Sequence, residues 1–170
     1  MSRDVVVAIF DNRNQAYDAA RDINLLGDDV VDVKTGAILE KDRLGNVSTL
    51  DTRNVDSAWG TVGGTAVGAL AGALIGLLAG PAGAAVGSAA GAAAAGAGAA
   101  TGGLVGGSLG LSTDLITWGL KQDDIDDIAA LLVPGKSALA IEVDEGSTEP
   151  IDAAVARDGG AVVYRTQLEI

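Results

Sequence analysis

The sequence predicts an α+β protein in which one α/β domain is interrupted by a helical hairpin. Two observations support this. No charged residue occurs in the 57 residues from Ser57 to Thr113, so all 11 basic and 23 acidic residues fall in the two flanks. In those flanks, short β-branched apolar runs alternate with segments of helical periodicity. We therefore assign residues 1–56 and 114–170 to one discontinuous α/β domain, and residues 57–113 to a Gly/Ala-rich helical hairpin.

The first flank predicts the order strand, helix, strand, strand. Residues 5–10 are apolar and rich in valine, which is typical of a strand covered on both faces. A polar turn then offers an N-cap, and apolar residues at helical spacing run from Ala16 to Leu26 until Gly27 closes the helix. The second strand covers residues 30–39, and a hairpin turn at residues 42–46 leads to a third strand at residues 47–52.

The second flank predicts helix, strand, helix, strand. The helix starts at Asp123 and ends at Pro134, and residues 137–144 form the strand that completes the order β-α-β-β-α-β. This is the ferredoxin-like order, and a helix at residues 149–157 and a strand at residues 161–166 extend it. The fold class is thus a split ferredoxin-like α/β sandwich with an inserted glycine-zipper helical hairpin. Residues 7–9 and 18–20 are weakly echoed by residues 139–141 and 152–154, which suggests an internal duplication.

Small residues recur every four positions along both arms of the central block. Residues four apart share one face of a helix, so each arm carries a groove that lets another helix approach closely, as in small-xxx-small packing. We expect Gly68 and Gly72 to lie where helix backbones touch, and Ala71, one residue off the stripe, to tolerate a larger side chain better. Pro81 marks the bend of the hairpin. The predicted helix-packing residues are Gly60, Gly64, Gly68, Gly72, Gly76 and Gly80 on the first arm and Gly83, Gly87, Gly91, Gly103 and Gly107 on the second.

Two environments would suit this hairpin. Residues 58–80 are uncharged and would span about 34 Å as a helix, enough for a bilayer core. Trp59 and Trp118 fall at the open end of the hairpin, where an interfacial aromatic pair belongs. The second arm, however, is nearly all alanine and glycine, which inserts weakly. We favour the membrane, with a buried core in a soluble assembly as the alternative and a flexible linker as the least favoured reading.

The composition excludes several classes of function. Cysteine and histidine are absent, which removes thiol chemistry, disulfides and nucleophile–histidine devices. A net charge of −12 argues against nucleic-acid binding. The segment Pro134-Gly135-Lys136-Ser137 imitates a phosphate loop but runs from helix to strand, the wrong order. We expect no catalytic, cofactor or metal residues. The acidic residues fit a solvated helix start and a solvated strand end with its loop; they are Asp123, Asp124, Asp126 and Asp127, and Glu142, Asp144, Glu145 and Glu149.

Taken together, the βαββ start, the glycine ladder with its proline turn and the αβαβ end resemble an uncharacterised bacterial glycine-zipper family, a domain of unknown function often labelled membrane or stress-related protein. The resemblance implies an association with membranes and supplies no catalytic residues. We expect a structural, self-associating protein in the bacterial inner membrane with its α/β domain in the cytoplasm, partnered by itself and by the lipid bilayer. A cytoplasmic soluble shell or filament is the alternative, and a small-ligand-binding regulatory module is the third.

Overall fold

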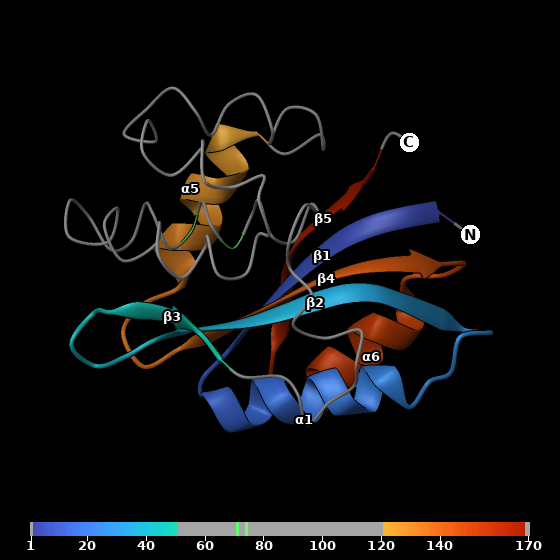
Figure 1. Ribbon diagram of the computed structural model, residues 1–170, viewed down its shortest axis with the longest axis horizontal. Coiled ribbons are helices and arrows are strands. Elements are labelled where there is room, and N and C mark those ends of the chain that lie inside the picture. The colour runs from blue at the N-terminus through green and yellow to red at the C-terminus, as the bar shows by residue number, and fades with distance from the viewer. Residues whose placement is uncertain (1, 51–70, 72–73, 75–120, 169–170) are drawn as a thin grey trace, which may run out of the picture.

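The computed structural model describes residues 2–50, Ala71, Leu74 and residues 121–168, and this part of the chain forms a five-stranded sheet with helices on both faces (Figure 1). The predicted mixed α+β class is confirmed. The elements are β1 (Ser2–Phe10), α1 (Arg13–Asn24), β2 (Val31–Lys41), β3 (Val47–Thr49), α5 (Gln122–Leu131), β4 (Ser137–Glu145), α6 (Glu149–Arg157) and β5 (Ala161–Gln167).

The strands of the two flanks interleave in one sheet. The order is β3-β2-β4-β1-β5, and each neighbouring pair is antiparallel. Strand β4 from the second flank lies between β1 and β2, with Val7 opposite Ala140 on one side and Ala37 opposite Ala140 on the other. The expected boundaries of the central block, at residues 56–57 and 113–114, lie outside the described residues.

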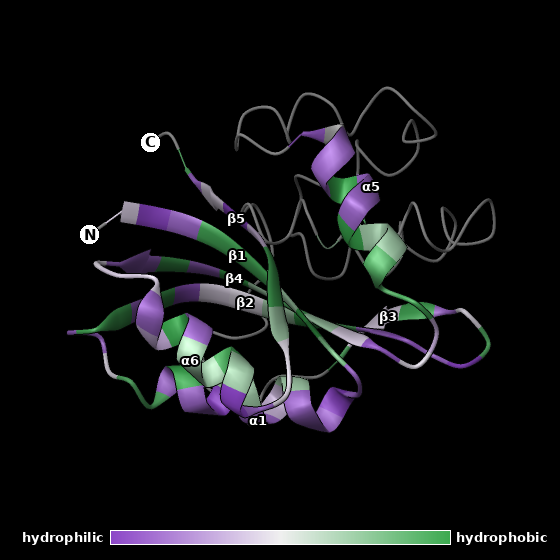
Figure 2. Cartoon of the chain, turned by 180° about the vertical axis from the view of Figure 1, so that it is seen from behind, coloured by the Kyte–Doolittle hydropathy of each residue, from purple (hydrophilic) through white to green (hydrophobic). Residues whose placement is uncertain are grey.

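The two faces of the sheet carry different helices. Helices α1 and α6 pack on one face, and α5 packs on the other, as Figures 1 and 2 show from opposite sides. We call these the α1/α6 face and the α5 face. Strand β1 is buried on both, since Val5, Val7 and Ile9 contact the α5 side whereas its alternate residues contact α1 and α6. The predicted doubly covered strand is confirmed.

The pairing of the elements differs from the sequence interpretation. That interpretation counted residues 47–52 as the third strand of the series, and treated the last helix and strand as an extension. In the structure β3 has only three residues and sits at the edge of the sheet, where it pairs with β2 alone. Helix α6 lies beside α1, and β5 pairs with the central β1. Local periodicity predicts each element, but it carries no information about which strands pair.

The predicted caps and turns have simple physical causes. The Asn12 side chain accepts hydrogen bonds from the backbone N–H groups of Asn14 and Gln15, and thereby caps α1. After α1, Gly27 takes a φ of 82°, a conformation that glycine adopts at little cost. In the β2–β3 hairpin, the Asp42 carboxylate accepts hydrogen bonds from the N–H groups of Leu44 and Asn46. Both turns lie where the sequence predicts them.

The two segments of the weak sequence repeat occupy equivalent positions in the fold. The β1–α1 and β4–α6 units contribute the two central strands and the two helices of the α1/α6 face, which lie side by side in Figure 2. Each unit then continues into a strand that pairs with the central strand of the other unit, β2 with β4 and β5 with β1. This arrangement is what a duplicated unit would produce, and the duplication itself stays a prediction.

The turn before β5 provides a test of this packing. A Cβ at Gly160 would lie 2.8 Å from Cζ of Phe10, and closer still to other atoms of that ring, which is 1% exposed. We expect Gly160→Ala to lower the free energy of unfolding by about 1–3 kcal/mol through overpacking, measured by urea denaturation. Gly146→Ala is the matched control, because a Cβ there meets nothing within 4 Å. Equal stability of the two variants would contradict the placement of the Phe10 ring.

Candidate functional site

The residues predicted to line the helix-packing stripe lie outside the described part of the chain. These are Gly60, Gly64, Gly68, Gly72, Gly76, Gly80, Gly83, Gly87, Gly91, Gly103 and Gly107, together with the predicted interfacial pair Trp59 and Trp118. Of the central block the structure describes Ala71 and Leu74, both of them helical. The candidate site is therefore built from these two residues and from the face of the sheet that they contact.

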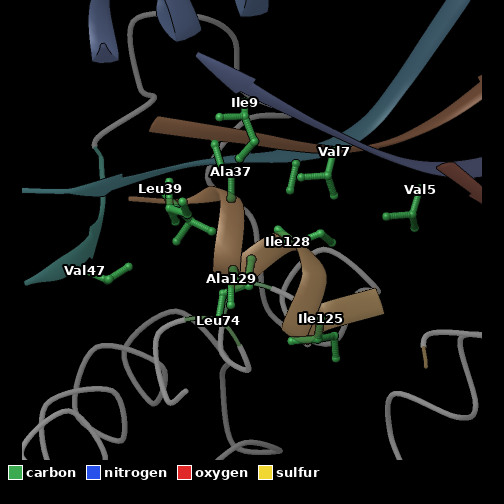
Figure 3. Packing of buried hydrophobic residues seen from close by; sticks show 14 of the residues in the cluster. Val5, Val7, Ile9, Ala37, Leu39, Val47, Leu74, Ile125, Ile128 and Ala129 are labelled. Atoms are coloured by element: carbon green, nitrogen blue, oxygen red, sulfur yellow. The ribbon is translucent and has the colours of Figure 1, made fainter. Parts of the chain in front are cut away.

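Ala71 and Leu74 are buried in the core on the α5 face. Their exposed fractions are 3% and 0%, and they belong to one cluster with residues of β1, β2, β3, β4 and α5. A spacing of three places both on the same side of a helix. Figure 3 shows Leu74 beside Ala129 of α5, below the sheet residues Ala37 and Leu39. Ala71 and Leu74 are thus packed against the α/β domain of their own chain.

This packing changes the expectation for Ala71. The sequence places Ala71 one residue off the glycine stripe and predicts that it tolerates a leucine. Because its side chain is enclosed by the apolar cluster, a leucine there would overpack the domain core. Ala71 is therefore unsuitable as a tolerant control position. Periodicity marks it as off the stripe but does not show what the other side of the helix contacts.

A second feature of the α5 face is a network of charged side chains where β1 begins and β4 ends. Alternate side chains of a strand point to the same face of a sheet. Arg3 therefore lies on the same face as Val5 of β1, and Asp144 on the same face as Ala140 of β4, both members of the apolar cluster on the α5 face. Arg3 Nε donates a hydrogen bond to Asp144 Oδ1 at 3.0 Å, and Glu142 Oε1 lies 3.8 Å from the same nitrogen. Lys34, at a bulge in β2, places Nζ 3.2 Å from Asp144 Oδ2 and also pairs with Asp32.

This network fixes the charge state of Asp144. The hydrogen bond from Arg3 lowers the pKa of the Asp144 carboxyl below its ordinary value, and the Lys34 ammonium acts in the same direction. The pKa of Lys34 is raised in turn by its hydrogen bonds with Asp32 and Asp144. These ion pairs connect side chains of β1, β2 and β4, so the network ties three adjacent strands together.

A matching network occupies the α1/α6 face at the same end of the sheet. Glu145 is 3% exposed, and its Oε1 lies 3.2 Å from Arg165 Nη1 on β5. Arg165 Nη2 also donates a hydrogen bond to Asp152 Oδ1 on α6, at 2.6 Å. Burial raises the pKa of the Glu145 carboxyl, and the nearby carboxylates of Asp4 and Asp152 raise it further, whereas Arg165 lowers it. The pKa values of the adjacent carboxyl groups of Asp144 and Glu145 are therefore shifted in opposite directions.

The sequence interpretation of these carboxylates is wrong at two positions. It placed Glu142, Asp144, Glu145 and Glu149 in a solvated strand end and loop. Glu149 is exposed and Asp144 is half-buried, but Glu142 and Glu145 are only 6% and 3% exposed. They are buried because β4 is a central strand, flanked by neighbours to its last residue. The central position of β4 is a long-range property, and no local sequence signal predicts it.

The other sequence motifs lie where the expected roles require. Gly135, at a φ of 92°, turns the chain from α5 into β4, so Pro134–Ser137 does run from helix to strand. Lys136 Nζ binds Asp11 Oδ1 at 2.8 Å and Ser137 is fully buried. Asp123 and Asp124 occupy the first turn of α5, where carboxylates interact favourably with the helix dipole. Among the described residues, no three His, Cys, Asp or Glu side chains are grouped so as to hold a metal ion.

Comparison with known proteins gives no relative: no protein-family model, no curated protein and no solved structure matches this chain. Within the described residues, no helix has the length and apolar character needed to cross a membrane. The geometry described above is therefore the basis for any functional assignment.

The opposite pKa shifts of Glu145 and Asp144 predict opposite pH dependences of the free energy of unfolding. Because the pKa of Glu145 is raised in the folded state, its stabilising contribution is present below the pKa of the unfolded chain and is lost as pH rises through the folded pKa. The pKa of Asp144 is lowered, so its contribution is present above the unfolded value and is lost as pH falls through the folded pKa.

We therefore expect Glu145→Gln to gain stability relative to the parent as pH rises from about 4 to about 7, since the substitution removes a carboxylate that the folded state disfavours. Asp144→Asn is the matched control on the neighbouring position, and it should lose stability relative to the parent as pH rises through the acid range below about 4, with little further change above it. Urea unfolding of both variants at a series of pH values measures this. Two difference curves of the same slope would contradict the assignment of the two networks.

Proposed function

We propose that the protein is a structural, self-associating protein and not an enzyme, in which glycine-zipper hairpins of the central block, residues 57–113, pack against one another. The observation that carries this proposal is the burial of Ala71 and Leu74 on the α5 face. These two residues anchor one side of the first arm to the α/β domain. The side of the arm that carries the glycine stripe is then available for another helix.

The helical projection supports this division of the arm into two sides. Gly72 and Gly76 each lie two residues from Leu74, which is about 160° around a helix of 3.6 residues per turn. In a helix that continues through these positions, they would project away from the side that holds Leu74 against the sheet. A stripe of glycines lets a second helix approach at backbone distance, where van der Waals contacts offset the roughly 1 kcal/mol that each glycine costs a helix.

The burial of Leu74 favours a protein core over lipid as the environment of the first arm. Leu74 lies within residues 58–80, the uncharged segment long enough to cross a bilayer, yet it packs among strands and α5 of the α/β domain. We therefore place a soluble, cytoplasmic homo-oligomer first. Insertion into the bacterial inner membrane, supported by the length of that segment and by the positions of Trp59 and Trp118, is the second candidate.

We further propose that β1, α1, β2, β4, α6 and β5 make up a ferredoxin-like unit, to which β3 and α5 are additions. The order β2-β4-β1-β5, the antiparallel pairing and the placement of α1 and α6 on one face support this. The similarity to an uncharacterised bacterial glycine-zipper family likewise stays a proposal. No residue of the described part favours the small-ligand module.

Leucine substitutions on the stripe test the self-association. We expect Gly72→Leu and Gly76→Leu to lower the mass of the assembly, because they break the contacts along the glycine stripe, while the α/β domain stays folded. Each new side chain occupies the space of a neighbouring backbone, at about 1–3 kcal/mol per contact. Light scattering reads the mass and circular dichroism reads the fold. Gly72→Ala is the size control and should assemble more fully.

Leu74→Ala tests the side of the arm that packs against the α/β domain, independently of the glycine stripe. It should lower the free energy of unfolding by about 2–5 kcal/mol, because it leaves a cavity in the α5-face core. If both leucine variants assemble like the parent, the glycine stripe is not the interface and the proposal fails.

The hairpin itself predicts a short distance between its ends. Because both flanks belong to one sheet, the central block must leave and return to the same domain. Spin labels at Ser57 and Thr113 should therefore be close together in the full chain, as measured by pulsed dipolar spectroscopy. A separation near a full arm length of about 34 Å would contradict a hairpin.

A further inference from the structure

Exposed apolar side chains gather at the two ends of β2. Among the described residues, the large hydrophobic side chains that stay exposed are Leu25, Val30, Leu44, Leu131 and Val133. Leu25 and Val30 lie in the loop before β2, and Leu44 lies in the hairpin after it, where 88% of the residue is exposed. An 11-residue strand separates these loops by about 35 Å. Figure 1 shows them at opposite ends of the sheet.

The end after β2 carries two basic side chains, Lys41 and Arg43, on either side of Asp42, whose carboxylate accepts hydrogen bonds from Leu44 and Asn46 of the turn. Leu131 and Val133 belong to the α5–β4 connection, which adjoins the hairpin through hydrogen bonds from Gly135 N to Lys41 O at 2.7 Å and from Lys41 N to Lys136 O at 3.1 Å. Neither Lys41 nor Arg43 forms an ion pair within the part of the chain that is described. We call this surface the basic end, and it comprises Lys41, Arg43, Leu44, Leu131 and Val133.

The end before β2 is acidic. Asp28 and Asp29 are exposed between Leu25 and Val30, and neither has an ion pair with another described residue. We call this surface the acidic end, and it comprises Leu25, Asp28, Asp29 and Val30. Both ends therefore carry exposed apolar side chains, and their net charges have opposite sign: two carboxylates at the acidic end, and Lys41 and Arg43 around Asp42 at the basic end.

We infer that the basic end of one copy binds the acidic end of a second copy. This inference rests on the proposed self-association and adds a second interface to it. Opposite charges steer the two ends together and fix their register, while the leucines supply apolar contact. Such an interface joins two different surfaces, so it repeats head to tail and closes into a ring or extends as a filament.

The charge pattern favours a second copy over other partners. The chain carries a net charge of −12, so copies repel one another except where a positive surface meets a negative one. An anionic lipid surface would attract the basic end, but it would repel the acidic end and leave Leu25 and Val30 without a role. Only a partner with a basic apolar surface fits the acidic end, and this chain supplies one.

Charge reversal on the full chain tests this interface. Lys41→Glu with Arg43→Glu makes both ends acidic, and Asp28→Lys with Asp29→Lys makes both ends basic. Each double variant should dissociate at a concentration about tenfold or more higher than the parent in sedimentation or light scattering at low salt. A mixture of the two double variants, and the quadruple variant in one chain, should recover the association of the parent. Circular dichroism and unfolding curves confirm that each variant is folded.

The outcomes separate this interface from the glycine stripe. If the double variants assemble like the parent, or if the quadruple variant and the mixture fail to recover, the head-to-tail contact is overturned. Gly72→Leu should leave the charge-dependent association in place, so loss in that variant alone supports only the glycine interface. Binding of the parent to vesicles of phosphatidylcholine and phosphatidylglycerol, lost in the Lys41/Arg43 variant and unchanged in the Asp28/Asp29 variant, would assign the basic end to lipid and overturn the inference.

Discussion

The pairing of β4 with both β1 and β2 is the constraint on which the rest of the structure depends. It joins residues 2–41 to residues 137–145 in one sheet, so the chain between Leu50 and Lys121 connects two parts of a single domain. The same pairing brings Asp144 within reach of Arg3 and Lys34, and places Glu145 beside Arg165. Core, charge networks and the anchoring of the central block all follow from where this strand is inserted.

Local signals made much of the fold predictable from the sequence. Three features depend on residues close together in the chain, and each is found where it is expected. They are the apolar strand at residues 5–10 that is buried on both faces, the Asn12 cap and the Asp42 turn. The burial of Glu142 and Glu145 was not predictable, because their partners Arg3 and Arg165 come from other strands. The edge position of β3 was missed for the same reason, since strand pairing is a long-range property.

For the central block, the sequence predicted the four-residue spacing of small residues but not what the first arm packs against. The four-residue spacing of glycines identifies a helix face without large side chains, but an apolar residue such as Leu74 is equally suited to lipid and to the face of a sheet. Hydropathy measures the cost of exposure to water and does not distinguish among the apolar surroundings that remove it. Burial of Leu74 in one cluster with Ala129 and the strands of the α5 face is what separates these environments.

The Arg3–Asp144 network sets the limit of the apolar surface on the α5 face. Helix α5 has ten residues and is about 15 Å long, whereas β2 has 11 residues and extends about 35 Å. A sheet face that was apolar over its whole length would leave surface that this helix cannot cover. The face instead changes to charged residues, where Arg3 forms ion pairs with Glu142 and Asp144. The apolar part that remains packs against α5 together with Ala71 and Leu74, so charge placement on the strands limits the surface that these residues cover.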